Sequence, residues 1–145
     1  MFDSIGGLRL SIRVVLAAYV LCSAGCATVL RPRPTAHPAG VLETQEGLAS
    51  YYGEGFHGRL AANGVPFDMN AMVAAHPAYP FGTLVRVTNL KNGRSVQVRI
   101  VDRGPASGPR TAGVIIDLSR HAARALGLVR DGRARVRLEV LRWGG

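Results

Sequence analysis

The strongest constraint on the fold is a series of short β-type segments, separated by glycine-containing turns, that begins near residue 47. Within this series there is no long helical period and no internal repeat. Short runs rich in Val, Ile, Leu and Thr are typical of strands. We expect strands at residues 48–52, 72–75, 84–89, 95–101, 114–118 and 134–141. Six strands of this length favour a closed or nearly closed β-barrel.

Two of the expected strands are predicted to pair as a hairpin. Apolar and polar residues alternate over 84–89, and the same alternation resumes over 95–101 after Asn92 and Gly93. Asn-Gly between alternating runs is typical of a tight turn, because both residues tolerate positive φ.

One short helix is expected, from Arg120 to about Leu126. Ser119 can cap its N-terminus, and Gly127 can take the left-handed conformation that ends it. The domain is therefore predicted to be mainly β, with one short helix.

Residues 1–25 have the layout of a signal peptide. Arg9 and Arg13 precede an apolar run at 14–21, and small residues follow at 23–25. The apolar run is shorter than the about 20 residues that a membrane-spanning helix needs. Export is therefore the expected fate of the chain.

Cys26 follows the small residues and is the candidate for lipidation. Small residues before a cysteine resemble a lipobox, in which a peptidase cuts before the cysteine and the new N-terminus carries lipid. Ser23 stands where leucine is usual, so plain cleavage and an uncleaved anchor stay open as alternatives. Because Ala27 follows the cysteine, we expect an outer-membrane lipoprotein that faces the periplasm, with a secreted periplasmic protein as the alternative.

Residues 26–46 are expected to form a tether between the leader and the domain. Arg-Pro-Arg-Pro at 31–34 and the small or polar residues after it favour extended backbone and offer little to bury. The β domain is expected at 47–145, a length that supports a single hydrophobic core.

The chain carries 18 basic and 9 acidic side chains, a net charge of +9. This charge favours an anionic partner. Because the chain is expected to be exported, that partner is expected to be an anionic lipid or a wall polymer, and not nucleic acid.

The residues that commonly hold metals and cofactors are sparse. Both cysteines, Cys22 and Cys26, lie in the leader, so the domain has no thiol for a disulfide, a nucleophile or a zinc site. The four histidines show no ligand spacing, so no metal is expected. Residues 53–58 have the glycine spacing of a dinucleotide site, but no helix pattern follows them, so no cofactor is expected.

A set of motifs spread over residues 47–119 resembles the rare lipoprotein A family. The motifs are Gly47-Leu48-Ala49-Ser50-Tyr51-Tyr52-Gly53, Ala62-Asn63-Gly64, Phe67-Asp68-Met69, Ala74-Ala75-His76, Pro80-Phe81-Gly82-Thr83, Asp102-Arg103-Gly104-Pro105 and Ile116-Asp117-Leu118-Ser119. The resemblance implies a six-stranded double-psi β-barrel that binds peptidoglycan. It also implies lytic transglycosylase activity between N-acetylmuramic acid and N-acetylglucosamine, on glycan strands stripped of stem peptides.

Asp102 is the candidate catalytic acid. A lytic transglycosylase needs a carboxyl group that protonates the leaving oxygen, while the 6-hydroxyl of the muramic acid attacks the anomeric carbon. Asp102 lies where an apolar strand runs into Arg103-Gly104-Pro105, a position that half-buries a carboxyl at a loop mouth, and it matches the functional Asp of the family. A turn-forming Asp before a Gly-Pro corner is the alternative.

Further candidates follow from the resemblance and from residue chemistry. His76 matches the functional His of the family and is the second catalytic candidate, expected to orient Asp102 or a sugar hydroxyl. Asp117 interrupts an apolar strand and is expected either to face the same cleft or to satisfy backbone donors. The expected substrate-binding residues are Tyr51, Tyr52, Asn63, Asp68, Arg103 and Asp117.

Val65 is a departure from the family pattern. Many relatives carry Glu directly after Asn-Gly, and the resemblance implies that this Glu takes part in cleavage, whereas valine can neither give nor take a proton. A non-catalytic peptidoglycan-binding protein is therefore the main alternative to an enzyme, and a scaffold that recruits envelope proteins is a third possibility. After the last expected strand we expect no glycan-binding repeat domain of the kind that many relatives carry.

Overall fold

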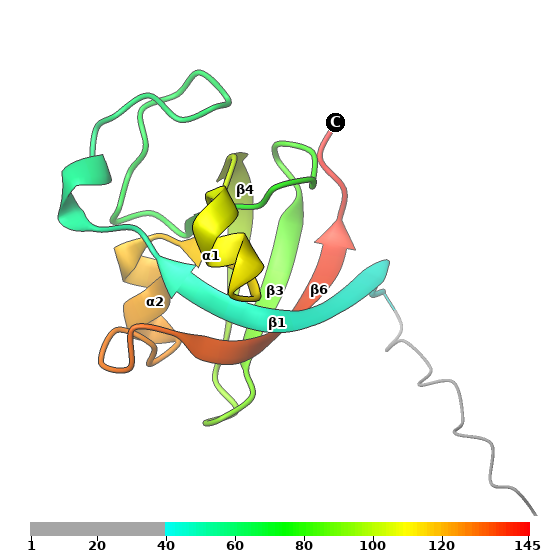
Figure 1. Ribbon diagram of the computed structural model, residues 1–145. Helices are drawn as coiled ribbons and strands as arrows, with labels where there is room; N and C mark the ends of the chain where they lie inside the picture. The colour runs from blue at the N-terminus through cyan, green and yellow to red at the C-terminus, as the bar shows by residue number, and fades with distance from the viewer. Residues whose placement is uncertain (1–39) are drawn as a thin grey trace, which may run out of the picture. The chain divides into compact units, whose positions relative to one another are not determined.

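Six strands close into a barrel in the order β1-β5-β2-β4-β3-β6 (Figure 1). The computed structural model describes residues 40–145. The strands are β1 (Glu43–Tyr51), β2 (Val73–Ala75), β3 (Leu84–Asn89), β4 (Ser95–Asp102), β5 (Val114–Leu118) and β6 (Ala134–Arg142). Two pairs, β1 with β5 and β2 with β4, run parallel, and the other neighbours run antiparallel. The six expected strands and the closed barrel are confirmed.

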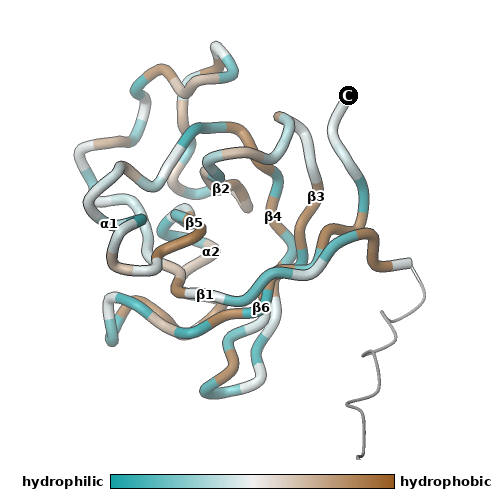
Figure 2. The backbone as a smooth tube through the Cα atoms, turned by 45° about the vertical axis from the view of Figure 1, so that its right-hand side comes forward, coloured by the Kyte–Doolittle hydropathy of each residue, from teal (hydrophilic) through white to brown (hydrophobic). Residues whose placement is uncertain are grey.

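The core lies inside the barrel because apolar residues alternate along its strands. Buried and exposed or half-buried positions alternate along β3 and along most of β4, and Figure 2 shows the matching alternation of hydropathy along the chain. Alternation with a period of two sends one set of side chains inward. The largest fully buried side chains are Ile100, Ile116, Leu118, Leu126, Leu128, Leu138, Val85, Val87, Val98, Val114, Val136 and Val140.

The predicted hairpin and helix are both present. Strands β3 and β4 pair antiparallel from Leu84↔Arg99 to Thr88↔Ser95, and Gly93 in the turn has a φ of 74°. Helix α2 (Arg120–Ala125) begins after Ser119, whose side chain accepts a hydrogen bond from the backbone N–H of Ala122.

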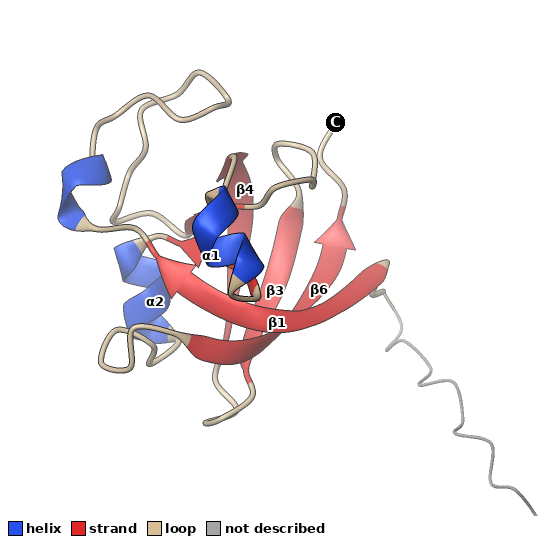
Figure 3. Ribbon diagram, in the orientation of Figure 1, coloured by secondary structure: helices blue, strands red, loops and turns tan. Residues whose placement is uncertain are grey.

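Two further helical segments were not expected. They are a 3-10 turn, η1 (Glu54–Phe56), and a short helix, α1 (Ser107–Thr111), drawn with α2 in Figure 3. Neither segment buries a residue, so neither has the apolar period by which a helix is recognised in a sequence. The prediction of a single short helix is therefore wrong.

The boundary between tether and domain lies earlier than the sequence pattern predicts. Strand β1 begins at Glu43, and its first residues pair with β6 from Glu43↔Val140 onward. Residues 43–46 are polar, and the backbone ladder to β6 holds them without burying an apolar face. The structure thus places residues 43–46, the last four of the expected tether, in β1, whereas the signal peptide, Cys26 and tether residues 26–39 lie outside the described part of the chain.

No helix within residues 40–145 has both the length and the apolar character needed to cross a membrane.

Replacing Ser119 by alanine tests how the β5–α2 corner is held. Ser119 is fully buried, and its hydroxyl donates to the carbonyl of Ala71 at 2.6 Å while accepting from Ala122 N–H at 3.2 Å. We expect Ser119→Ala to lower the free energy of unfolding by about 1 to 2 kcal/mol, because it removes a cap and leaves a carbonyl unpaired. Urea unfolding measures this, with exposed Ser95→Ala as the control; equal stability of the two variants would contradict it.

Candidate active site

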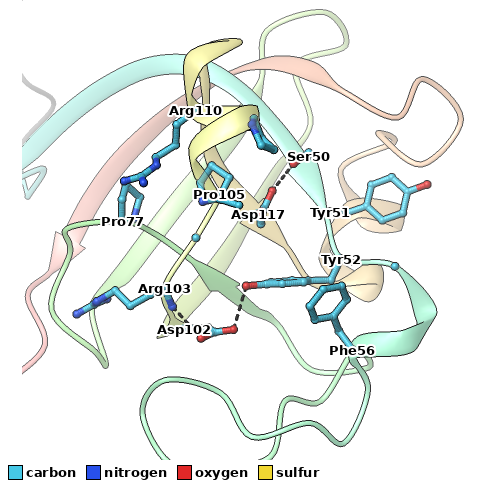
Figure 4. Close-up of a pocket in the computed structure, with 14 residues that line it drawn as sticks. Ser50, Tyr51, Tyr52, Phe56, Pro77, Asp102, Arg103, Pro105, Arg110 and Asp117 are labelled. Atoms are coloured by element: carbon cyan, nitrogen blue, oxygen red, sulfur yellow. Dashed lines mark hydrogen bonds between the residues drawn. The ribbon is translucent and has the colours of Figure 1, made fainter.

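A cleft with a volume of about 580 Å³ opens beside the ends of β1 and β4 (Figure 4). Its walls come from four places: the end of β1 with the turn after it, the loop after β2, the segment from β4 into α1, and one residue of β5. The lining residues are Ser50, Tyr51, Tyr52, Gly53, Phe56, Pro77, Asp102, Arg103, Gly104, Pro105, Ala106, Pro109, Arg110 and Asp117.

Asp102 is the last residue of β4 and is half-buried in this cleft. Its Oδ1 accepts hydrogen bonds from the backbone N–H groups of Ala62 and Arg103, both at 2.8 Å. Its Oδ2 accepts a third from the Tyr52 hydroxyl at 2.9 Å. Both carboxylate oxygens are therefore held as acceptors in a fixed orientation.

Tyr52 connects the aromatic wall of the cleft to Asp102. Its ring packs at tilted angles against Phe56 and Phe67, with centroids 4.9 and 4.6 Å away. Burial, together with the hydrogen bond to Asp102 and the negative charges of Asp102 and Asp117, raises the pKa of Tyr52 well above its usual range. The phenol therefore stays protonated and acts as a donor to Asp102.

Asp117 brings a second carboxyl group into the cleft. It lies on β5, where the parallel register with β1 sets it beside Ser50, whose hydroxyl donates to its Oδ1. Burial is the main cause that raises the pKa of Asp117, and the nearby charge of Asp102 adds to it; the Ser50 hydrogen bond and the charge of Arg133 oppose the rise.

Gly104 lies between the Tyr52 hydroxyl and the Asp117 carboxyl group. A methyl group at this position would lie 3.3 Å from the Tyr52 hydroxyl oxygen and 3.4 Å from Asp117 Oδ2. Glycine leaves this space open, so the oxygen that hydrogen bonds to Asp102 and the free oxygen of Asp117 border the same small volume.

The structure does not bring His76 into the cleft. His76 is only 3% exposed, and its ring stacks on Tyr79 with centroids 3.6 Å apart. Its Nδ1 accepts from the N–H groups of Ala78 and Tyr79, and its Nε2 lies 3.3 Å from the side-chain oxygen of Gln45. Its link to Asp102 is through the backbone, where His76 N–H donates to the Asp102 carbonyl at 3.2 Å.

Arg103 lines the cleft, but its guanidinium also anchors the neighbouring loop. Its Nη1 donates to the carbonyls of Tyr79 at 2.9 Å and His76 at 3.3 Å, and its Cζ lies 3.9 Å above the centre of the Phe81 ring. Figure 4 shows the side chain directed away from Tyr52. Arg103 is thus a fixed positive charge at the edge of the cleft.

Three residues expected in or near the site belong to a hairpin at 58–67 and its exit, which extends beyond the strands in Figure 1. Asn63 caps the hairpin turn, since its Oδ1 accepts from Val65 N–H at 3.0 Å. Val65 is 57% exposed, and Asp68 is exposed with its Oδ1 bonded to the N–H of Asn70. None of the three lines the cleft, which the hairpin reaches through the Ala62 N–H bond to Asp102.

Tyr51 lines the cleft as expected, but its hydroxyl points away from it in Figure 4 and donates to the carbonyl of Val129 at 3.4 Å. Ser50 and Arg110 also line the cleft, and neither is predicted as a site residue from the sequence. Ser50 becomes visible only through the β1–β5 register, and Arg110 lies on the unexpected helix α1.

No group of three or more His, Cys, Asp or Glu side chains within residues 40–145 is arranged as a metal site. The polar chemistry of the cleft therefore consists of two carboxyls, a phenol, a serine hydroxyl and two arginines.

The state of His76 predicts a pH dependence of stability. Burial, aided by the charge of Arg103, lowers the pKa of His76 from 6.5 to about 4. The unfolded chain then binds the proton more tightly, so stability is complete above about pH 6.5 and is lost as the pH falls toward 4, by up to about 3 kcal/mol. We expect His76→Asn, whose amide oxygen can replace Nδ1 as acceptor, to lower stability at pH 7 but to flatten this dependence. Unfolding curves from pH 4 to 7 check it, and parallel profiles for the two proteins would refute it.

Comparison with known families agrees with this site. A family model described as lytic transglycolase matches residues 44–138. The probable endolytic peptidoglycan transglycosylase RlpA of Synechocystis sp. is 52% identical over 103 residues, which are 71% of this chain and 31% of the relative. The endolytic peptidoglycan transglycosylase RlpA of Neisseria meningitidis is 53% identical over 98 residues, 68% of this chain and 39% of the relative.

Solved structures show the same barrel in other proteins. The Streptomyces papain inhibitor superposes with a TM-score of 0.55 and 24% identity, covering 70% of this chain and 97% of its own. The expansin of Clavibacter michiganensis superposes with a TM-score of 0.53 and 26% identity, covering 71% of this chain and 52% of its own.

The chain spans about a third of the length of the curated relatives that it matches. The family match runs from within β1 to within β6. On the family match over residues 44–138, the chain belongs to the lytic transglycolase family of double-psi β-barrel proteins, the rare lipoprotein A family.

Proposed function

We propose that the protein is a peptidoglycan lytic transglycosylase that cleaves between N-acetylmuramic acid and N-acetylglucosamine in peptide-stripped glycan strands. The observation that carries the proposal is the pair of carboxyls, Asp102 and Asp117, that line one cleft in different environments. Relatives about 50% identical over the barrel are named as endolytic peptidoglycan transglycosylases.

In this proposal the two carboxyls divide the proton transfers. Asp117, whose pKa burial raises, is the carboxyl better suited to act as the acid, and it gives a proton to the glycosidic oxygen as the bond to the anomeric carbon breaks. Asp102, whose oxygens are oriented as acceptors, takes the proton of the muramic 6-hydroxyl as that oxygen bonds to the anomeric carbon. The products are a 1,6-anhydromuramic end and a free 4-hydroxyl, and no water is consumed. This differs from the sequence-based expectation, in which Asp102 is the catalytic acid.

Other residues of the site hold the substrate or support the carboxyls. Tyr52 and Phe56 offer apolar faces for sugar rings, and Arg110 offers a charge for the lactyl carboxylate of muramic acid. We assign His76 a positioning role, since it is buried and its backbone N–H, just after β2, donates to the Asp102 carbonyl.

The location proposed for the protein is the cell envelope, where peptidoglycan lies. A lipid on Cys26 would hold the chain at the outer membrane with the barrel facing the periplasm, and release into the periplasm after plain cleavage is the alternative. Both rest on the sequence of the leader.

Product analysis tests the enzyme directly. We expect purified protein incubated with amidase-treated, peptide-free sacculi to release fragments with anhydromuramyl ends, identified by mass spectrometry. Asp102→Asn and Asp117→Asn each remove one proton transfer and are expected to lower the rate by at least about 100-fold. Because the pKa of Asp117 is raised, folding favours its protonated form, so Asp117→Asn is expected to be no less stable than the parent at pH 7. Intact sacculi after incubation with well-folded parent protein would overturn the enzyme proposal.

Val65 favours a second candidate function, a protein that binds peptidoglycan without cutting it. The family pattern has Glu at this position of the 58–67 hairpin, and here an exposed valine stands in its place. The same cleft would then bind the glycan, and its two carboxyl groups would serve only as hydrogen-bond partners of the sugar.

The variant Val65→Glu separates the two functions. If Asp102 and Asp117 suffice, the parent releases anhydromuramyl products and Val65→Glu changes the rate by less than about tenfold, less than a lost proton transfer would cost. If the parent only pellets with sacculi and Val65→Glu alone releases products, the binding function holds. The matched control is Leu60→Glu, which adds the same charge at another exposed apolar position of the hairpin.

A further inference from the structure

Trp143 presents an exposed aromatic surface just after β6. It is the only tryptophan of the chain, and 38% of its area is exposed. Its ring meets Tyr79 edge to face, with centroids 5.3 Å apart, and Tyr79 in turn stacks on His76. The indole therefore packs against a pair of stacked, buried rings.

The backbone next to Trp143 is fixed to the loop before β3. Gly144 N–H donates to the hydroxyl of Thr83 at 3.0 Å. A methyl group on Gly144 would lie 1.9 Å from the carbonyl oxygen of Phe81, so only glycine lets the two segments lie this close. This contact holds Trp143 in one place relative to the 76–83 loop.

Arg103, which follows β4, contacts the same loop and connects it to the cleft. Arg103 is a lining residue whose guanidinium lies flat on Phe81 and bonds to the Tyr79 carbonyl, while the Tyr79 ring supports Trp143. Arg103 is exposed, and among the described residues no carboxylate forms an ion pair with it. Arg103 after β4 and Trp143 after β6 thus both pack against the 76–83 loop, which also contributes Pro77 to the cleft lining.

We propose that Arg103 and Trp143 form a further glycan subsite, beyond the two carboxyls, for a strand that leaves the cleft past Pro77. The indole stacks on the apolar face of a sugar ring, and the guanidinium pairs with the lactyl carboxylate of a muramic acid unit. The inference rests on the proposed function only in that its ligand is the same glycan. It adds a preference for strands long enough to reach Trp143 and for sugars that carry the carboxylate.

The chain provides its own reporter for this subsite, because all indole fluorescence comes from Trp143. The Asp102→Asn variant is titrated with peptide-free glycan oligomers of increasing length, so that the ligand stays intact. We expect a saturable change in emission with long oligomers and a weaker one with the shortest. Calorimetry on the same samples measures binding independently of the indole.

Substitution of Trp143 measures its contribution. In the Asp102→Asn background, Trp143→Ala is expected to weaken binding of long glycan by about tenfold, as expected for one lost aromatic stacking contact. Leu90→Ala is the matched control, because Leu90 is 39% exposed and lies in the β3–β4 turn, outside the cleft lining. Circular dichroism and unfolding curves show whether each variant keeps its fold.

The charge of Arg103 is tested through the ligand, since replacing Arg103 would also break its bonds to the loop. Glycan whose lactyl carboxylates have been reduced to alcohols is expected to bind about tenfold more weakly than native glycan. Glycan that binds by calorimetry with unchanged emission, and with equal affinity for Trp143→Ala, would overturn the subsite while leaving the proposed function in place. Absence of any binding, with no products from the parent protein, would instead overturn the proposed function.

Discussion

The parallel pairing of β1 with β5 is the constraint on which the site depends. This register sets Ser50 opposite Asp117, and one step further Tyr52 N–H bonds to the carbonyl of Leu118 at 3.0 Å. The pairing thereby carries Tyr52 to the end of β4, where its hydroxyl reaches Asp102. Parallel neighbours need a long crossover, so Ser50 and Asp117, which are 67 positions apart in the sequence, meet only because the barrel closes.

Asp102 turns this geometry into a rigid site. Its carboxylate joins three separate segments, the turn after β1 through Tyr52, the 58–67 hairpin through Ala62, and its own loop through Arg103. A half-buried carboxylate is stable only when such donors replace water. Asp117 has fewer partners and is held at a cost, since burial raises its pKa and disfavours its charge at neutral pH. One cleft therefore contains a carboxylate held by three donors and a second carboxyl whose charge burial disfavours, the asymmetry that the proposed acid and base steps need.

The sequence was sufficient for the barrel and insufficient for the interior of the site. Alternating apolar residues, Asn92-Gly93 and Ser119 predicted the strands, the hairpin and the helix cap, because each depends on neighbours in the chain. The polar start of β1 at Glu43 and helix α1 were missed, since pairing and loop packing hold them without a buried face. Asp102, Asp117, Tyr52 and Arg103 were expected in the cleft and are there, while His76 lies beneath it and Asp68 outside it. A family motif predicts that a residue lies near the site. The direction in which its side chain points depends on the fold.

The position of Val65 is compatible with both candidate functions, cleavage of peptidoglycan and binding without cleavage. The hairpin that carries Val65 is tied to Asp102 by a backbone N–H, which any residue at 62 other than proline would supply. Changing the side chain at the hairpin tip therefore leaves the Asp102 carboxylate in place and alters only the exposed surface of the hairpin. Because Val65 is exposed and outside the cleft lining, the carboxyl pair of Asp102 and Asp117 does not depend on it for its geometry. The two carboxyl groups thus lie at the ends of β4 and β5, and the side chains of the hairpin can change without moving them.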